Sequence, residues 1–182
     1  MKPIFTLNEL ISALSQSSKD NYKTIFKNLV LDKNVLGEYL NWSTKKYVRN
    51  GIYKSDNFEL ILLCWEAGQE TPIHCHSGEE CWMYLIEGEI EEVQYHKYEN
   101  GDVEAKGIRK IANQQQAYIN DAIGLHKLKN NSKGRTISLH LYAKPIESCS
   151  YFDEQSKTFI KKNLSYDTYK GEILSSKIVS SI

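Results

Sequence analysis

The chain has 182 residues, a length typical of one domain, and its 41% hydrophobic content is sufficient for a globular core. It carries 23 Lys plus Arg and 23 Asp plus Glu, so its formal net charge is zero. This balance argues against a nucleic-acid or anionic-membrane partner, either of which requires a basic excess. The longest apolar run, residues 60–65, is far shorter than the roughly 20 residues of a membrane span. We therefore expect no nucleic-acid and no membrane partner.

The cysteines and the N-terminus predict a reducing compartment. The four cysteines stand at positions 64, 75, 81 and 149 and form no paired framework. Residues 1–6 contain no apolar segment of signal-peptide length. The sequence therefore predicts free thiols and a cytoplasmic location.

Residues 1–42 have the pattern of helices. Thr6 and Glu9 form a T-x-x-E capping box before an apolar stripe made of Leu7, Leu10, Ile11 and Leu14. Asp20 is the expected cap of a second helix, whose stripe consists of Tyr22, Ile25, Phe26, Leu29 and Val30. We expect both helices to pack on the outside of a larger body.

The remainder of the chain has the pattern of a β-protein. Across residues 45–145, short runs rich in Val, Ile, Tyr and Leu alternate with turn signals such as Asn50-Gly51, Glu87-Gly88 and Asn100-Gly101. Many short strands in succession favour a sandwich or a barrel. Residues 146–182 are more polar and predict one hairpin and a covering tail. We expect one mainly β domain over residues 1–182.

Two histidines spaced i, i+2 are the first candidate for chemistry. On a strand, His74 and His76 would share one face while Cys75 lies on the other. Two imidazoles on one face can hold a metal ion, although hydrogen-bonded surface histidines are an equally weighted reading of this pattern alone. Gly68 precedes His74 by six residues and Gly88 follows His76 by twelve, as in the first motif of cupins, G-x5-H-x-H-x(3,4)-E-x6-G. Cys81 occupies the glutamate position of that motif, with Glu80 beside it.

Two further segments place polar side chains on one face of a strand. In residues 136–142, Ser138, His140 and Tyr142 alternate with three aliphatic residues. Such a strand is usually half-exposed, but a barrel that encloses a polar site would turn the same three side chains inward. Tyr47 and Arg49 form a similar i, i+2 pair.

Together these segments resemble the cysteine dioxygenase family, thiol dioxygenases with a cupin fold. The resemblance rests on five motifs in the same order, namely Tyr47-Val48-Arg49-Asn50, His74-Cys75-His76, Cys81, Ile123-Gly124-Leu125-His126 and Ser138-Leu139-His140-Leu141-Tyr142. It implies a jelly-roll β-barrel, a monomer, and Fe(II)-dependent oxidation of L-cysteine by O2 to L-cysteine sulfinate in cysteine catabolism.

The resemblance also implies roles for individual residues. The metal ligands would be His74, His76 and His126, which hold one Fe(II) per chain without an organic cofactor. Arg49 and Tyr47 would bind the substrate carboxylate, and a hydrogen-bonded row of Ser138, His140 and Tyr142 would lie beside the iron and the substrate. Cys81 would be the cysteine that joins Tyr142 through a thioether in some members, and Cys149 corresponds to a cysteine near the mouth of the site.

The residue types suit this reaction, but three alternatives stay open. Three neutral imidazoles leave the iron its full charge, which favours a thiolate ligand. A dioxygenase for another thiol such as 3-mercaptopropionate is the nearest alternative, although such relatives have Gln in place of Arg49. The others are a non-catalytic metal-binding cupin and nucleophilic catalysis by Cys75 or Cys81.

Overall fold

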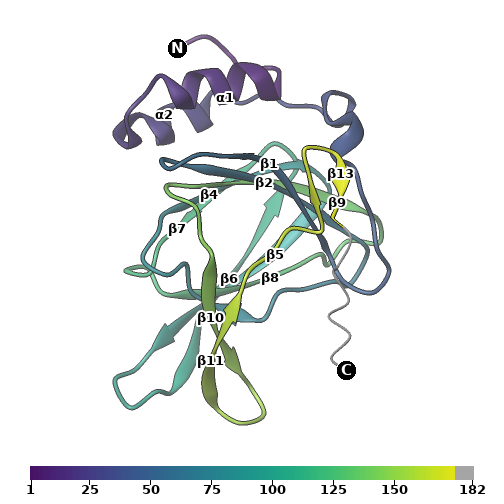
Figure 1. Ribbon diagram of the computed structural model, residues 1–182. Helices are drawn as coiled ribbons and strands as arrows, with labels where there is room; N and C mark the ends of the chain where they lie inside the picture. Colours follow the sequence, from purple (N-terminus) through teal and green to yellow (C-terminus); the bar gives the residue numbers. More distant parts are fainter. Residues whose placement is uncertain (175–182) are drawn as a thin grey trace, which may run out of the picture.

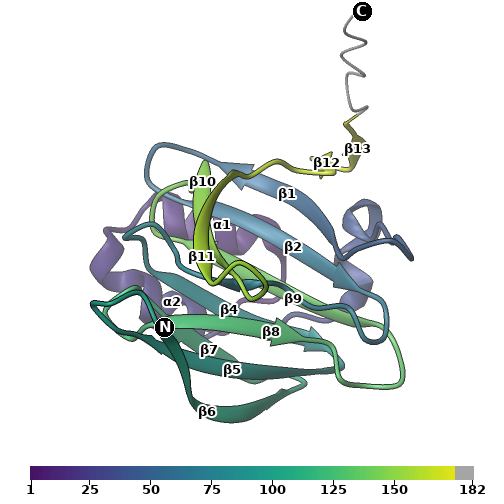
Figure 2. The same cartoon turned by 90° about the horizontal axis from the view of Figure 1, so that it is seen from below.

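The β-rich segments form two sheets in a computed structural model that describes residues 1–174. The strands of the seven-stranded sheet are, in spatial order, β13 (Glu172–Ile173), β12 (Thr168–Tyr169), β1 (Val48–Lys54), β2 (Glu59–Trp65), β9 (Thr136–Tyr142), β4 (Cys81–Glu87) and β7 (Gln116–Ile119). Those of the six-stranded sheet are β11 (Thr158–Asn163), β10 (Ser148–Asp153), β3 (Ile73–His74), β8 (Leu125–Lys129), β5 (Glu89–Lys97) and β6 (Val103–Ala112). The two sheets face each other and form a barrel (Figures 1 and 2).

The N-terminal helices cover the outer face of the seven-stranded sheet (Figure 1). Helix α1 (Leu7–Ser15) begins with the predicted capping box, in which Thr6 accepts from the Glu9 amide. Helix α2 (Tyr22–Lys27) follows a 3-10 turn, and two further 3-10 turns span Lys33–Val35 and Gly37–Tyr39. Buried side chains of both helices pack against Leu62 and Leu139 of the sheet. The prediction of a mainly β barrel with helices outside is confirmed.

The second helix is shorter than predicted, and its cap differs. Asp20 lies inside the 3-10 turn Lys19–Asn21 and does not cap α2. The helix ends at Lys27 because the next residues pair with the N-terminal segment: the Val30 amide donates to the Ile4 carbonyl at 2.9 Å. Val30 follows the bridge between Ile4 and Leu29 and is exposed, so its assignment to the apolar stripe was wrong.

Strand β9 separates two cores. Its aliphatic side chains, Ile137, Leu139 and Leu141, belong to the cluster under the helices. Tyr142 belongs to a second cluster between the sheets, together with Trp65 of β2. All seven residues of β9 are buried, so its polar face lies inside the barrel. The strand is therefore buried on both faces, and the half-exposed alternative is wrong.

The C-terminal part contains the predicted hairpin, β10–β11. After it, β12 returns to the other sheet and pairs in parallel with β1. Residues 175–182 of the predicted tail lie outside the described residues. The single-domain assignment over 1–182 stays a prediction. Within residues 1–174, none of the helices has the length and apolar character needed to span a membrane.

The turn between β4 and β5 provides a test of the fold. Gly88 has a φ of +89°, and a Cβ there would lie 2.2 Å from Thr136 Oγ1. Gly101 has a φ of +92° and no atom within 4 Å of such a Cβ. We expect Gly101→Ala to cost about 1–2 kcal/mol of unfolding free energy, from φ alone, and Gly88→Ala to cost about 2–5 kcal/mol because overpacking is added. Equal losses in urea denaturation would contradict the predicted contact with Thr136.

Candidate metal centre

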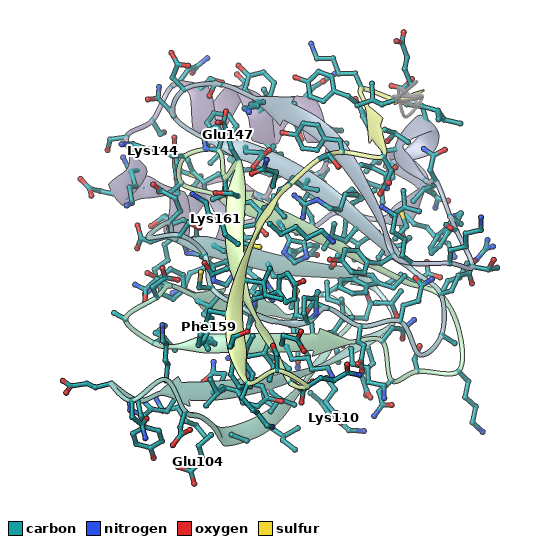
Figure 3. All side chains as sticks on the ribbon, turned by 60° about the horizontal axis from the view of Figure 1, so that its bottom comes forward. Glu104, Lys110, Lys144, Glu147, Phe159 and Lys161 are labelled. Atoms are coloured by element: carbon teal, nitrogen blue, oxygen red, sulfur yellow. The ribbon has the colours of Figure 1, made fainter. Side chains whose placement is uncertain are left out.

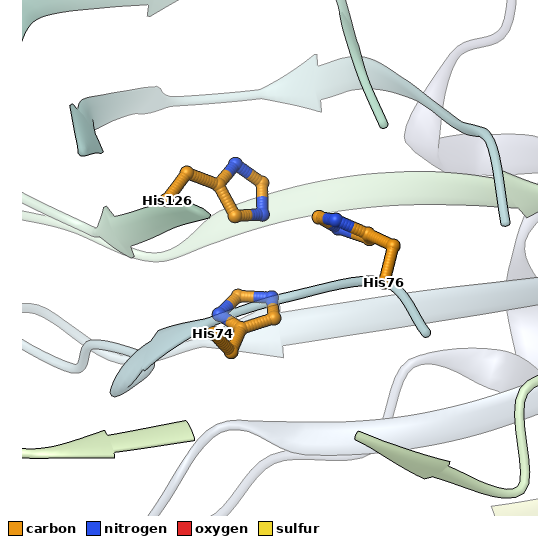
Figure 4. A group of neighbouring side chains, drawn as sticks. All are labelled: His74, His76 and His126. Carbon is orange, nitrogen blue, oxygen red and sulfur yellow. The ribbon is translucent and has the colours of Figure 1, made fainter. Parts of the chain in front are cut away.

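Three histidines from different segments converge inside the barrel. His74 ends β3, His126 lies on β8 directly opposite it, and His76 follows β3. One ring nitrogen from each lies within 4.8 Å of the others. Figure 4 shows the three rings turned toward a common point. The three side chains of the predicted ligand set are therefore brought together.

His76 is not on a strand, contrary to the prediction for the H-x-H motif. Strand β3 ends at His74, and the chain turns after it. The carboxylate of Asp121 holds this turn, since Oδ1 accepts from the His76 amide and Oδ2 from the Gly78 amide, both at 2.7 Å. Cys75 packs against Ile73 in a separate apolar cluster. The two rings thus meet because a carboxylate folds the loop, and not because of strand alternation.

The hydrogen bonds of the imidazoles fix which nitrogens face the cluster. His126 Nδ1 lies 2.7 Å from Oε1 of Glu92, and His74 Nδ1 lies 2.9 Å from the Pro72 carbonyl. Both partners are acceptors, so both Nδ1 atoms carry hydrogen and both Nε2 atoms keep a lone pair. Within the described residues, His126 Nε2 and His76 Nδ1 are buried without a hydrogen-bond partner. Buried nitrogens without a hydrogen-bond partner are suited to bind a metal ion.

Electrostatics keeps these imidazoles neutral. Burial, followed by the neighbouring histidines, holds the pKa of His76 and of His126 well below its ordinary value. Burial also lowers the pKa of His74. A neutral imidazole is the form that binds a metal, and three of them suit a transition metal such as iron, copper or zinc. The donor set therefore fits a metal ion.

The acidic residue beside the cupin glutamate position does not join the cluster. Glu80 accepts from the Tyr118 hydroxyl at 2.5 Å and pairs with Lys19 at 2.7 Å. The metal-compatible group found in residues 1–174 consists of the three histidines alone. Cys81 is buried at the start of β4, directly opposite Tyr142.

Two members of the predicted polar row on β9, Ser138 and His140, are hydrogen-bonded to each other. Trp65 Nε1 donates to Ser138 Oγ at 2.9 Å, and Ser138 Oγ lies 2.9 Å from His140 Nε2. An indole can only donate, so the serine hydroxyl hydrogen is available to His140. The His140 and Tyr142 rings are stacked 6.4 Å apart. Burial, with Arg49 nearby, lowers the pKa of His140 to about 3, so this ring is also neutral.

A cavity of about 250 Å³ connects the cluster with the substrate-binding candidates. Its lining includes Tyr47, Arg49, His74, His126, His140 and Tyr142. Tyr47 stacks on Trp65 with ring centroids 4.5 Å apart. The β10–β11 hairpin, on which Figure 3 labels Phe159 and Lys161, contributes the cross-strand partners Cys149 and Lys162 to the cavity wall. Two of the metal candidates, the Arg49–Tyr47 pair and two members of the polar row therefore line one cavity.

Three site residues were missed by sequence reasoning. Glu92 is buried within an acidic run that reads as solvated surface, and it also pairs with Arg109. Asp121 lies in a loop, 45 positions from the residue it holds. Trp65 ends the longest apolar run and reads as core. None of them has a local signal, because their partners are distant in sequence.

Comparison with known proteins finds relatives that all carry the same family name. The family profile described as Cysteine dioxygenase type I matches residues 7–155. The chain is 33% identical over 122 residues to cysteine dioxygenase type 1 of Rattus norvegicus, which covers 65% of this chain and 61% of the rat protein. It is 29% identical over 168 residues to the Danio rerio protein of that name, which covers 86% of this chain and 83% of the relative. It thus spans about six tenths of the rat relative and most of the zebrafish one.

The fold has structural neighbours as well. A crystal structure of a Thermus thermophilus protein superposes with a TM-score of 0.50 at 20% identity, over 60% of this chain and 93% of the other. Two facing sheets around an internal histidine cluster define a cupin barrel with a metal-compatible site. Since the family profile matches most of its length, the chain belongs to the cysteine dioxygenase type I family.

The carboxylate behind His126 provides a test of the centre. A carboxylate on the second nitrogen of a ligand histidine orients the ring and raises its basicity. We expect Glu92→Gln to weaken Fe(II) binding roughly 10- to 100-fold in an anaerobic chelator competition. Glu91→Gln is the matched control, because Glu91 lies on the opposite face of β5 and accepts from Asn131. Equal affinities for the two variants would exclude Glu92 from the centre.

Proposed function

We propose that this chain is an Fe(II)-dependent dioxygenase that oxidises L-cysteine with O2 to L-cysteine sulfinate. The observation that carries the proposal is a cavity lined by His74 and His126 of the neutral histidine cluster, by Arg49 and by the buried Tyr142. Membership of the cysteine dioxygenase type I family supports it. In this reaction the thiol gains both oxygen atoms of O2, so no further reductant is required.

His74, His76 and His126 are the residues that would hold the iron. When bound, iron supplies the electron-transfer chemistry that allows O2 to react with a thiol. The ligands are three neutral imidazoles with no carboxylate, so the ion keeps its full double charge. Such a centre favours an anionic sulfur donor and lowers the pKa of a bound thiol.

Arg49 and Tyr47 would bind the substrate carboxylate. Both side chains line the cavity, and the stack on Trp65 holds the Tyr47 ring in place. The planar guanidinium can bind a carboxylate through two parallel hydrogen bonds. The substrate would thereby be held at both ends, with its sulfur and amine toward the histidines.

Tyr142 would act as a hydrogen-bond donor beside the reacting sulfur. Burial, together with the neighbouring Cys81 thiol, raises the pKa of Tyr142 well above its ordinary value. The phenol therefore keeps its hydrogen at neutral pH. The stacked His140 ring, held by Ser138, limits the positions that the phenol can take. Orientation before reaction is the expected contribution of this row.

The alternatives are less well supported. An arginine at position 49 favours cysteine over 3-mercaptopropionate, whose dioxygenases resemble this chain but have Gln there. A passive metal-binding cupin has no need of an oriented phenol. Nucleophilic catalysis is disfavoured because burial raises the pKa of Cys81 strongly and because Cys75 packs in a different cluster. The monomeric state and the cytoplasmic location stay predictions.

The test of the proposal is anaerobic loading with Fe(II), followed by L-cysteine and air. The expected result is one cysteine sulfinate formed for each O2 consumed, with no activity in His76→Ala. Loaded protein that consumes no O2 and forms no sulfinate would overturn the proposed function. Oxygen uptake with 3-mercaptopropionate alone would instead support the first alternative.

Substitution of the arginine tests the carboxylate contact. A charge-assisted hydrogen bond is worth about 1.5–3 kcal/mol, so Arg49→Gln should lower kcat/KM for L-cysteine by about tenfold or more. The loss should be much smaller for cysteamine, which has no carboxylate. Arg135→Gln is the control, since Arg135 is exposed and pairs with Glu66. If Arg49→Gln affected both thiols equally, Arg49 would have a structural role only.

A thioether between Cys81 and Tyr142 is a further expectation. The two residues are direct cross-strand partners on β4 and β9, and both are buried. With iron, O2 and thiol present, the thiol and a ring carbon of the phenol would each lose one hydrogen, with O2 as the oxidant. Intact mass and peptide mapping after turnover should show one species lighter by two hydrogens with the two peptides joined.

Two variants distinguish the contribution of the thioether to activity from that of the phenol hydroxyl. Cys81→Ala should keep a substantial part of the activity, because the bond only restricts a phenol that is already oriented. Tyr142→Phe should lose more, because it removes the donor. Fully separate peptides in an active, iron-replete enzyme would exclude the cross-link.

A further inference from the structure

The chain segment after the β10–β11 hairpin runs directly beside Arg49. The Arg49 amide donates to Asp167 Oδ2, and the Asp167 amide donates to the Arg49 carbonyl, both at 2.9 Å. The other carboxylate oxygen of Asp167 lies 2.6 Å from Lys46 Nζ. One residue, Asp167, thus holds both the amide and the carbonyl of Arg49 from the side opposite β2, although it lies 118 positions further along the chain.

The next residue is anchored in a buried position. Thr168 Oγ1 donates to Asn50 Oδ1 at 2.7 Å, and these residues are 2% and 0% exposed. Asn50 in turn donates to the Leu62 carbonyl of β2 at 3.2 Å. Loss of the threonine hydroxyl would leave the Asn50 oxygen buried without this donor, which is costly. The segment is therefore joined to the core of the barrel.

Two tyrosines complete the attachment. The Tyr166 and Tyr169 rings are stacked 5.5 Å apart over Gly51, where a Cβ would lie 2.7 Å from the Tyr169 ring. The Tyr166 hydroxyl donates to the buried Glu59 carboxylate. The absence of a side chain at position 51 thus allows the tyrosines to lie directly on β1.

The segment also contacts the guanidinium itself. Arg49 Nε donates to the Ser165 carbonyl at 3.1 Å, and both residues line the cavity. A free arginine side chain has many rotamers, and its order costs entropy when a ligand binds. A carbonyl fixed on Nε restricts the guanidinium before the ligand arrives, and such pre-organisation increases affinity.

We propose that residues 165–169 are a positioning element that holds Arg49 in the orientation that binds the substrate carboxylate. The inference rests on the proposed function and deepens it, because it assigns carboxylate selectivity to residues that need not touch the substrate. The segment lies beyond residues 7–155, which the family profile matches. Asp167 holds the backbone of Arg49, Thr168 holds the adjacent Asn50, and the Ser165 carbonyl holds the guanidinium.

The experiment compares the anaerobic binding of two probes to the iron-loaded protein. L-Cysteine and cysteamine share the thiol and the amine, and only L-cysteine has the carboxylate. We expect Asp167→Ala and Thr168→Val to weaken L-cysteine binding about tenfold or more and to leave cysteamine binding unchanged. Thr168→Ser keeps the hydroxyl and should therefore bind L-cysteine as tightly as the wild type does. Asp153→Ala is the matched control, since Asp153 caps the distant β10–β11 turn by accepting from the Gln155 amide.

A double-mutant cycle provides the decisive comparison. In the Arg49→Gln background, Asp167→Ala should cause no further loss of L-cysteine affinity, since the arginine that it positions is gone. Equal weakening of both probes, or full additivity with Arg49→Gln, would overturn the positioning role. A wild-type protein that binds L-cysteine no better than cysteamine would overturn the proposed role of Arg49, and the present inference with it. If the wild type binds L-cysteine better than cysteamine and both Asp167→Ala and Thr168→Val keep this preference, only the present inference would be overturned.

Discussion

The interior of this barrel holds titratable side chains away from water, and each of them requires a partner inside the protein. Buried polar groups without hydrogen bonds are costly, so the arrangement stands only if donors and acceptors match. Glu92 satisfies His126, Ser138 satisfies His140, and Trp65 satisfies Ser138. The described nitrogens that stay unpaired on the histidines are the ones that a metal would take. The same requirement that stabilises the interior therefore also defines the site.

Much of this arrangement could be predicted where a local pattern carries the information. The capping box at Thr6 and the alternation of β9 are contained in consecutive residues, and both were correct. The three candidate ligands were found through their motifs. The Asp20 cap was wrong because Asp20 lies inside a 3-10 turn, and the helix is shorter than predicted because residues 28–30 pair with the N-terminal segment. Propensity is a weak guide when tertiary pairing competes with it.

The rest of the site depends on contacts between distant parts of the chain. Nothing in the Glu91-Glu92 pair indicates which carboxylate is buried, because the face of β5 is decided by its pairing with β8. Likewise, His76 is placed by Asp121, and Arg49 by Asp167. Each of these carboxylates accepts from the backbone amide of a residue more than 40 positions away. Such partners cannot be identified from a single sequence.

The two sheets contribute different groups to the site. Two of the histidines lie on β3 and β8 of the six-stranded sheet, while Arg49 and the polar row belong to the seven-stranded sheet. A substrate held between them would be fixed at its sulfur by one sheet and at its carboxylate by the other. Proximity and orientation of this kind can supply a large part of a rate enhancement. Residues 165–169 join the seven-stranded sheet, because β12 pairs with β1.

The central claim is that the three-histidine centre delivers dioxygen to the sulfur of cysteine. Its most direct test is turnover of L-cysteine by the iron-loaded protein under isotopically heavy O2, with mass analysis of the product. The account predicts cysteine sulfinate with both sulfinate oxygens heavy. A sulfinate that carries oxygen from water, or cystine as the sole product, would contradict it.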